Sequence, residues 1–477
     1  MRLNEKDYTY FTTVRGLCRR CRQIVPARVF FRQGQVWQQS LCANPACGEA
    51  PPARIAADQN GFLASTLKPM PDHSPLPGSH APARGCPHDC GPCALHASPC
   101  QLPVLSITNA CQLRCPICFT YNRADKLYHM PVEEMRRTVD WIVESSGPVD
   151  LINITGGEPT LHPQILDILD CCRRPEIGRV TMNSNGLRLA EDKSLCQALA
   201  ERNVYVILSF NTLDSAVSER LHGRDLVAVK RQAIDNLTAA GVRMTLLTVL
   251  IRDVNEDALG GIWSLMRQND NVLSLTVQTM TYTGQGGGSF PNTGHIPVDE
   301  AARIVCEQTG GELTFTDFVT RPSTHPLCYL VSYALKAGPS NSAGTNILPF
   351  ARIASPDRLA DLIRDSYLVR PEEGQEFFAD MINPLYAQGN SEHLATLREL
   401  VERLYPVGKS LSAFERQRIA ESAVRTVYIH AHMDEETFDC SRAMMCPDLV
   451  PAGPGRLIPA CTYNLFNRMQ DERFYVE

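Results

Sequence analysis

Short apolar strands and helices alternate six times in the middle of this 477-residue chain, between about Pro103 and Leu335. The expected strands cover residues 103–107, 150–155, 179–182, 204–210, 243–251 and 272–281. Near-continuous apolar strands separated by helices are typical of a parallel sheet covered by helices. The pattern therefore predicts an α/β fold, a partial (β/α)6 TIM-type barrel, with its functional side chains at the carboxyl ends of the strands.

A loop with three cysteines follows the first expected strand. Cys111, Cys115 and Cys118 have the spacing C-x3-C-x2-C. Three thiolates can hold three irons of a [4Fe–4S] cluster, and the missing fourth ligand leaves one iron open to bind another molecule. The spacing alone leaves a zinc knuckle or an electron-carrier cluster open as alternatives.

The turn after the second strand narrows this choice. Gly156-Gly157-Glu158-Pro159 follows residues 150–155. Cysteine loop and glycine turn, in this order and at strand ends, resemble the radical S-adenosylmethionine (SAM) enzymes. The resemblance implies that Cys111, Cys115 and Cys118 hold the catalytic cluster. It also implies that SAM chelates the open iron and yields a 5′-deoxyadenosyl radical.

The same resemblance predicts which residues contact the cofactor. Glycine lets the backbone come close, so the turn is expected to meet the amino group of SAM, with Glu158 as an acceptor. Other expected contacts lie at the ends of later strands. The expected cofactor-binding residues are Gly156, Gly157, Glu158, Asn183, Asn185 and Ser209.

Four cysteines near the start of the chain form two close pairs. Cys18-x2-Cys21 and Cys42-x4-Cys47 flank a β-like stretch at residues 25–38. Two thiolate pairs on turns suit a tetrahedral site for zinc or a single rubredoxin-type iron. The ligands do not distinguish these metals, and cysteines without a metal remain the alternative.

A Pro/Gly-rich linker at residues 68–84 leads to a second cysteine triplet. Cys86, Cys90 and Cys93 repeat the C-x3-C-x2-C spacing, and Cys100 follows. No strand precedes this triplet, and a fourth ligand is close in sequence. We expect a fully ligated auxiliary [4Fe–4S] cluster here; a zinc site, or an exchange of roles between the two triplets, are the alternatives.

The remaining cysteines are dispersed. Cys328, Cys440, Cys446 and Cys461 could hold a second auxiliary cluster, although free cysteines are commonly buried small hydrophobes. We expect core packing for the cysteines in or beside predicted helices, which are Cys171, Cys172, Cys196 and Cys306. His430, His432 and Asp434 alternate on a strand-like stretch, which indicates a solvated face, a metal site or a wall of the substrate cavity.

The cysteine-rich flanks resemble one branch of the radical SAM superfamily, the branch of the archaeal tetraether lipid synthase and a pterin carbon-methylase. The resemblance rests on the N-terminal cysteines, on Gly85-Cys86-Pro87-His88-Asp89-Cys90-Gly91-Pro92-Cys93, and on residues 276–284, 324–328 and 428–434. One departure is Ser323, where the branch leads us to expect a cysteine. The ligand set near Cys328 therefore stays open.

Four parts are expected along the chain. They are a rubredoxin- or zinc-knuckle-like domain (1–68), a linker with the auxiliary cluster motif (69–100), the partial barrel (101–335) and a mixed C-terminal domain (336–477). Residues 336–350 are expected as loop and residues 356–424 as mostly helical.

The net charge of −6 gives no reason to expect a nucleic-acid partner. Neither a signal peptide nor an apolar run of about 20 residues is present. Clustered cysteines at metal-ligand spacing favour a reducing cytoplasm over a disulfide scaffold.

The leading functional hypothesis is radical chemistry at an unactivated carbon of a small molecule or lipid, most simply carbon methylation by a methyltransferase. An electron donor such as flavodoxin or ferredoxin is expected as a partner. The alternatives are carbon–carbon coupling of lipid chains, radical modification of a peptide, and a non-catalytic iron–sulfur electron carrier. The barrel itself does not select among the reactions.

Overall fold

A computed structural model describes residues 6–66, 79–91, 93–338, 346–364, 371–453 and 455–476. Most of the expected linker, residues 68–78, lies outside the described residues.

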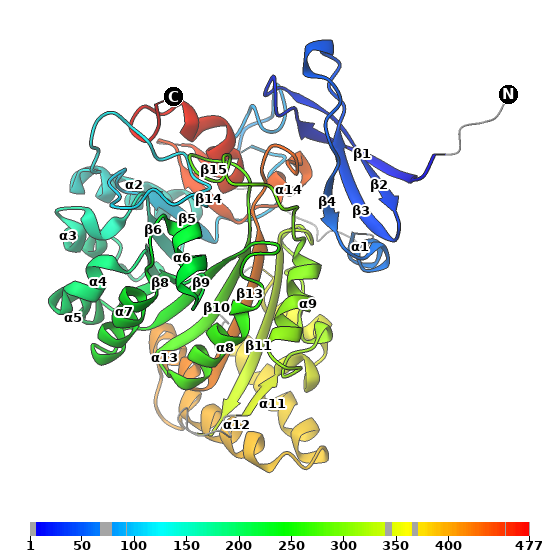
Figure 1. The fold of residues 1–477 in the computed structure, drawn as a ribbon. Coiled ribbons are helices and arrows are strands. Elements are labelled where there is room, and N and C mark those ends of the chain that lie inside the picture. Colours follow the sequence, from blue (N-terminus) through cyan, green and yellow to red (C-terminus); the bar gives the residue numbers. More distant parts are fainter. Residues whose placement is uncertain are drawn as a thin grey trace.

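The N-terminal residues form a separate small sheet, drawn in blue in Figure 1. Four antiparallel strands pair in chain order: β1 (Thr9–Leu17), β2 (Ile24–Arg32), β3 (Gln35–Ser40) and β4 (Ala53–Ala56). Helix α1 (Gln59–Thr66) follows. β2 and β3 are the expected β-like stretch, whereas β1 and β4 were not expected because their alternation is weak.

The six expected barrel strands are all present and pair side by side in parallel. They are β5 (Leu102–Ser106), β6 (Val149–Thr155), β7 (Ile177–Ser184), β8 (Tyr205–Ser209), β9 (Met244–Leu250) and β10 (Val272–Thr279). Their buried side chains belong to one hydrophobic core that also receives the covering helices. The predicted α/β partial barrel is confirmed.

Helices follow the strands and lie outside the sheet (Figure 1). They are α2 (Val132–Ser146), α3 (Ile165–Cys171), α4 (Leu187–Glu191), α5 (Lys193–Glu201), α6 (Ser215–His222), α7 (Val227–Ala239), α8 (Ala258–Gln268) and α9 (Val298–Gln308). The short helices α4 and α6 were not expected. Cys171, Cys172 and Cys196 are buried in this core, as predicted.

Strands from the C-terminal part of the chain extend both edges of the barrel sheet. β13 (Val424–Ala431) pairs in parallel with β10, and β11 (Tyr329–Ala337) and β12 (Asn346–Pro349) continue that edge. β14 (Asp448–Pro451) pairs with β5, and β15 (Leu457–Pro459) lies outside it. The expectation of loop over 336–350 is wrong where β11 and β12 form. The domain boundaries stay a prediction.

The C-terminal helices α10 (Pro356–Leu362), α11 (Pro371–Ala387), α12 (Ser391–Leu404) and α13 (Ala413–Ala423) confirm the expected helical stretch. They pack on β11 and β12 around a second apolar core. Short helices α14 (Cys440–Met444) and α15 (Ala460–Thr462) lie near the carboxyl end of β13. None of the described helices is long and apolar enough to span a membrane.

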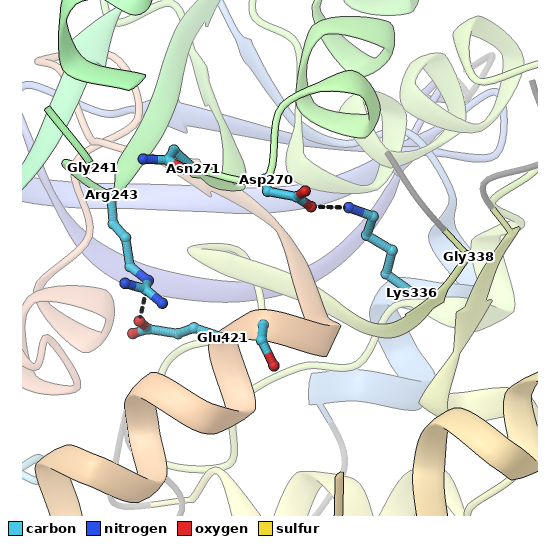
Figure 2. A pocket seen from close by; sticks show the side chains of 8 residues that line it. Gly241, Arg243, Asp270, Asn271, Lys336, Gly338 and Glu421 are labelled. Atoms are coloured by element: carbon cyan, nitrogen blue, oxygen red, sulfur yellow. Dashed lines mark hydrogen bonds and ion pairs between the residues drawn. The ribbon is translucent and has the colours of Figure 1, made fainter. Parts of the chain in front are cut away.

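A cavity lies at the amino ends of β9 and β10, the end of the sheet opposite the predicted site (Figure 2). Its walls carry a network of ion pairs. Glu421 of α13 is buried and accepts from Arg243 at 2.8 Å, from Arg179 at 2.6 Å and from the Tyr205 hydroxyl at 2.9 Å. This network joins the C-terminal helices to the barrel.

Replacing Glu421 tests how much this ion-pair network stabilises the protein. Glu421→Gln leaves two partly buried guanidinium groups without their counter-charge, so we expect the free energy of unfolding to fall by about 3 kcal/mol. Thermal or denaturant unfolding measures the change. Glu219→Gln, at an exposed site of α6, is the control and should change stability by less than about 0.5 kcal/mol. Equal losses in the two variants would contradict the role of the network.

Candidate functional site

The cysteine loop and the glycine turn are bound together beyond the ends of β5 and β6. The Gly157 N–H donates to Thr108 O at 2.7 Å, and the Glu158 N–H donates to Ala110 O at 2.6 Å. A Cβ at Gly156 would lie 2.3 Å from Thr108 O, and one at Gly157 would lie 2.2 Å from Ala110 O. Only glycine allows this approach, so the turn fixes the backbone that leads directly into Cys111.

Glu158 organises the neighbouring strand end. Its Oε1 accepts from the Thr160 hydroxyl at 2.7 Å and the Ser184 hydroxyl at 2.9 Å, and its Oε2 accepts from the Asn185 N–H at 2.7 Å. The side chain is 1% exposed, and burial raises the pKa of its carboxyl group. Glu158 thus clamps the turn after β6 to the turn after β7. Its predicted contact with SAM stays a prediction.

The three thiols of the loop lie in one electrostatic environment. Burial, and then the nearby charges of Glu158 and Cys118, raise the pKa of Cys111 to about 11. Burial and Cys118 raise the pKa of Cys115 to about 12. The thiols of Cys111 and Cys115 are protonated at neutral pH unless a bound cation removes their protons, as coordination to a metal does. The donor set therefore suits a metal cluster.

Two residues that the sequence analysis missed lie behind Cys115. His222 Nδ1 is 3.6 Å from Cys115 Sγ, and Lys230 Nζ is 3.4 Å from His222 Nε2. Lys230 also donates to Ser209 O at 2.7 Å. Burial lowers the pKa of Lys230 to about 8, with the charges of Cys115 and Glu158 opposing it. The available signal was a lysine on the apolar face of α7.

The three other residues expected to bind the cofactor differ in whether their side chains have hydrogen-bond partners. Asn185 Nδ2 lies 3.4 Å from Gln112 Oε1, and Ser209 contacts Lys230. Asn183 Oδ1, at the carboxyl end of β7, is buried without a hydrogen-bond partner. A buried acceptor without a donor costs free energy. Such an atom at this end of the sheet, beside the glycine turn, fits a polar cofactor like SAM.

The C-terminal segment fastens the residues that follow the cysteine loop. Asn464 Nδ2 donates to Phe119 O at 2.7 Å, and Asn464 Oδ1 accepts from the Tyr121 N–H at 3.2 Å. Arg468 donates to Tyr121 O and to the Ser106 hydroxyl, each at 2.5 Å. Residues from the far end of the chain thus hold the loop against β5.

The four N-terminal cysteines converge. The Sγ atoms of Cys18, Cys21, Cys42 and Cys47 all lie within 4.8 Å of one another. Cys21 Sγ and Cys42 Sγ are 3.7 Å apart, close to the about 3.8 Å edge of a tetrahedron with 2.3 Å metal–sulfur bonds. Burial raises the pKa of Cys47 to about 12. The arrangement fits a tetrahedral four-thiolate metal site.

The linker triplet meets a cysteine from α14. Cys440 Sγ donates to Cys86 O at 3.3 Å, and Cys86 Sγ lies 3.8 Å from Cys440 O. The hydrogen bond with Cys440 lowers the pKa of Cys86, but Cys90, burial and the charge of Cys93 raise it overall. The structure therefore brings Cys440 beside this triplet.

Cys100, the expected fourth ligand of that triplet, belongs to a different apolar cluster from Cys86, and its role as a ligand stays a prediction. It packs in an apolar cluster with Leu449, Leu457 and Trp141. Burial foremost, and then the charge of Asp448, raise its pKa. The surroundings of Cys100 are those of a buried small hydrophobe.

The three remaining cysteines line a single cavity near the carboxyl end of β13. Cys328, Cys446 and Cys461 face it together with Arg442, His432 and Asp448. Arg442 Nε donates to Cys328 Sγ at 3.3 Å, and His432 Nδ1 lies 3.4 Å from Cys461 Sγ. Asp434 does not line this cavity; its Oδ2 lies 2.8 Å from His295 Nε2. The alternating residues of the tail therefore do not share one ligand site.

Gly157→Ala tests the close approach at the turn. Its Cβ would force the two backbones apart and weaken both hydrogen bonds, so amide exchange at positions 157 and 158 should rise by about tenfold, which corresponds to about 1.4 kcal/mol. Hydrogen exchange with mass spectrometry measures this. Gly61→Ala is the control, because its nearest atom, 3.3 Å away, belongs to the Asp58 side chain, which can move. Unchanged exchange at the turn in Gly157→Ala would contradict the analysis.

Comparison with known proteins agrees with this geometry. Residues 105–263 match the model of the radical SAM superfamily. The chain is 26% identical over 423 residues to a 7,8-dihydro-6-hydroxymethylpterin dimethyltransferase of Methanocaldococcus jannaschii, covering 82% of each chain. It is 31% identical over 179 residues to a GTP 3′,8-cyclase of Chlorobaculum tepidum, covering 37% of this chain and 52% of that enzyme.

Among solved structures, Streptococcus suis SuiB bound to S-adenosylmethionine matches with a TM-score of 0.38 and 21% identity. The match covers 44% of this chain and 47% of SuiB, so this chain spans about half of that protein. The family match contains the cysteine loop, the glycine turn and the strand ends that carry them. Residues 105–263 therefore form a radical SAM domain, and the similarity to the archaeal dimethyltransferase supports an enzyme.

Proposed function

We propose that this enzyme methylates a carbon atom of a reduced pterin or a closely related heterocycle. The observation that carries the proposal is the similarity to the archaeal dimethyltransferase, which covers 82% of both chains and therefore extends well beyond the barrel. The similarity to the cyclase covers only 37% of this chain. A shared barrel without the flanks would carry no information on the reaction.

In this proposal Cys111, Cys115 and Cys118 hold the catalytic [4Fe–4S] cluster. When bound, the cluster and SAM supply a 5′-deoxyadenosyl radical that removes hydrogen from an unactivated carbon. Gly156 and Gly157 bring backbone close to SAM, and Asn183 Oδ1 accepts a hydrogen bond from it. Glu158 keeps the two turns together.

Three further residues act around this centre. Asn185 and Ser209 border the SAM site from the ends of β7 and β8. Lys230 fixes Ser209 through its carbonyl oxygen and places a positive charge near Cys115. A cation there offsets part of the negative charge of a thiolate-bound cluster.

The flanking parts hold further metal centres in this proposal. Residues 1–68 form the domain with one zinc or rubredoxin-type iron on Cys18, Cys21, Cys42 and Cys47. Residues 69–100 and 336–477 supply ligands for auxiliary [4Fe–4S] clusters on either side of the barrel, residues 101–335. An electron donor such as flavodoxin or ferredoxin reduces the enzyme.

Product analysis tests the proposed reaction. Anaerobically reconstituted enzyme, given SAM, dithionite and 7,8-dihydro-6-hydroxymethylpterin, should form 5′-deoxyadenosine and a pterin heavier by one or two CH₂ groups, detected by mass spectrometry. Cys115→Ala should lower both products by more than about a hundredfold, since an incomplete ligand set cannot hold the cluster. Cys306→Ala, beside the core and outside the site, should retain both.

The two parts of the proposal fail separately. Formation of 5′-deoxyadenosine without a methylated pterin would exclude the substrate and leave the radical chemistry in place. Full activity of Cys115→Ala would exclude this cysteine triplet as the catalytic one.

Metal analysis tests the N-terminal centre. Cys42→Ser removes one corner of the four-thiolate tetrahedron, so the full-length protein should lose about one zinc or one mononuclear iron per chain. Because the metal would cross-link the turn between β1 and β2 to the segment after β3, thermal unfolding of this sheet should also begin at lower temperature. Cys172→Ala, buried in the barrel core, should leave the metal content unchanged. A metal content in Cys42→Ser equal to that of the parent would contradict this assignment.

A further inference from the structure

The cavity at the amino ends of β9 and β10 lies at the end of the sheet opposite the cysteine loop. Its volume is about 420 Å³, within the range of about 300–1,000 Å³ that is usual for small-molecule sites. Figure 2 shows its two ion pairs, Arg243 with Glu421 and Lys336 with Asp270. Among the described residues that line it, none belongs to the cysteine loop or the glycine turn. The cavity is therefore separate from the radical SAM site.

Positive charges outnumber negative charges in the ion-pair network around this cavity. Its two carboxylates, Glu421 and Asp270, form ion pairs with five cations, which are Arg179, Arg243, Arg418, Lys336 and Arg425. Five cations against two carboxylates leave an excess of three positive charges in the network. The Asp270 side chain is 67% exposed, so solvent screens its charge, whereas Lys336 and Arg425 are buried. Buried cations require negative charge close by.

The pKa values of the buried cations reflect this shortage of negative charge. Burial lowers the pKa of Arg425 to about 10; the charge of Asp270 opposes this shift, and the charge of Arg243 adds to it. Burial also lowers the pKa of Lys336, and the charge of Arg425 acts in the same direction. An anion bound among these groups would stabilise the charged form of each.

Hydrogen-bond donors are also in excess. Arg425 Nε and Arg179 Nε are buried and have no hydrogen-bond partner among the residues that the structure describes. Arg243 directs Nε to Glu421 Oε2 at 2.8 Å and Nη2 to Arg418 O at 3.4 Å, and a guanidinium carries five N–H donors in all. Phosphate oxygens accept several such hydrogen bonds at once, so groups of arginines suit phosphate.

We propose that this cavity binds the phosphate group of a small organic molecule, with Arg243 and Lys336 donating directly to the phosphate oxygens. The excess of three positive charges favours a phosphate dianion over a carboxylate with a single charge. The volume leaves room for more than the phosphate group. The bound molecule contacts β9 through Arg243, β11 through Lys336 and α13 through Ser422, and so stabilises the junction of the C-terminal helices with the barrel.

Equilibrium dialysis of the full-length protein with radiolabelled inorganic phosphate tests this site, under anaerobic conditions and at an ionic strength held constant with chloride. Charge-assisted hydrogen bonds from two cations correspond to a dissociation constant on the order of 1 mM, and we expect one phosphate per chain. Unlabelled ribose 5-phosphate should displace the label at the same concentration as unlabelled phosphate or a lower one. Failure of ribose 5-phosphate to compete would restrict the site to free phosphate and overturn the organic ligand.

Variants that change the charge of the cavity in opposite directions separate ligand binding from stability. Lys336→Gln removes a phosphate ligand, so the dissociation constant should rise about tenfold; Arg243→Gln repeats the test should Lys336→Gln unfold. Asp270→Asn removes a carboxylate that repels the phosphate, so the dissociation constant should fall about threefold even though an ion pair is lost. Arg137→Gln, at an exposed site of α2, is the control and should bind phosphate like the parent. Thermal unfolding checks that each variant is folded.

Three outcomes would overturn the inference. The first is phosphate binding that does not saturate, and the second is equal binding by Lys336→Gln and Arg137→Gln. The third is weaker binding by Asp270→Asn than by the parent, which would mean that the network serves stability alone. The proposed methylation is tested separately by the formation of methylated pterin, so neither result decides the other.

Discussion

Two backbone hydrogen bonds, from the Gly157 N–H to Thr108 O and from the Glu158 N–H to Ala110 O, fix the start of the cysteine loop against the glycine turn at the carboxyl ends of the barrel strands. They continue the pairing of β5 with β6 past the point where both strands end. The cysteine loop begins directly after this pairing, so Cys111 starts from a fixed backbone. Glu158 also fixes the turn after β7, because its carboxylate accepts hydrogen bonds from the Ser184 hydroxyl and the Asn185 N–H.

The proposed metal centres are connected to one another by apolar contacts. Leu17, next to Cys18, packs in one cluster with Cys86 and Cys440. Cys461 packs against the same cluster, and His432 lies between Cys461 and Phe119. The described residues therefore contain a continuous line of contacts from the N-terminal cysteines to the catalytic loop. Such a line suits both electron supply and exclusion of water from the cavity.

Local sequence patterns predicted the barrel and the position of the cysteine loop at the end of its first strand, because both depend on neighbours in the chain. Strand periodicity located all six barrel strands, and the spacing of Cys111, Cys115 and Cys118 is itself the signal for their site. Contacts between distant residues left no such signal. Cys440 and Cys86 are separated by 354 positions, so no spacing pattern indicated their contact, and the expected role of Cys100 as fourth ligand of the linker triplet stays a prediction. The contacts of Lys230 with Ser209 and His222, and the pairing of β13 with β10, likewise form only in the folded sheet.

The hydrogen bonds from Asn464 and Arg468 to the loop after Cys118 have a consequence for biosynthesis. The ribosome completes the cysteine loop when more than three hundred residues are still to be added, because the contact between Phe119 and Asn464 spans 345 positions. Cys440, Cys446 and Cys461 emerge equally late. A nascent chain that has passed Cys118 therefore still lacks the residues that hold this loop against β5, so the loop can reach its final conformation only after Arg468 has been added.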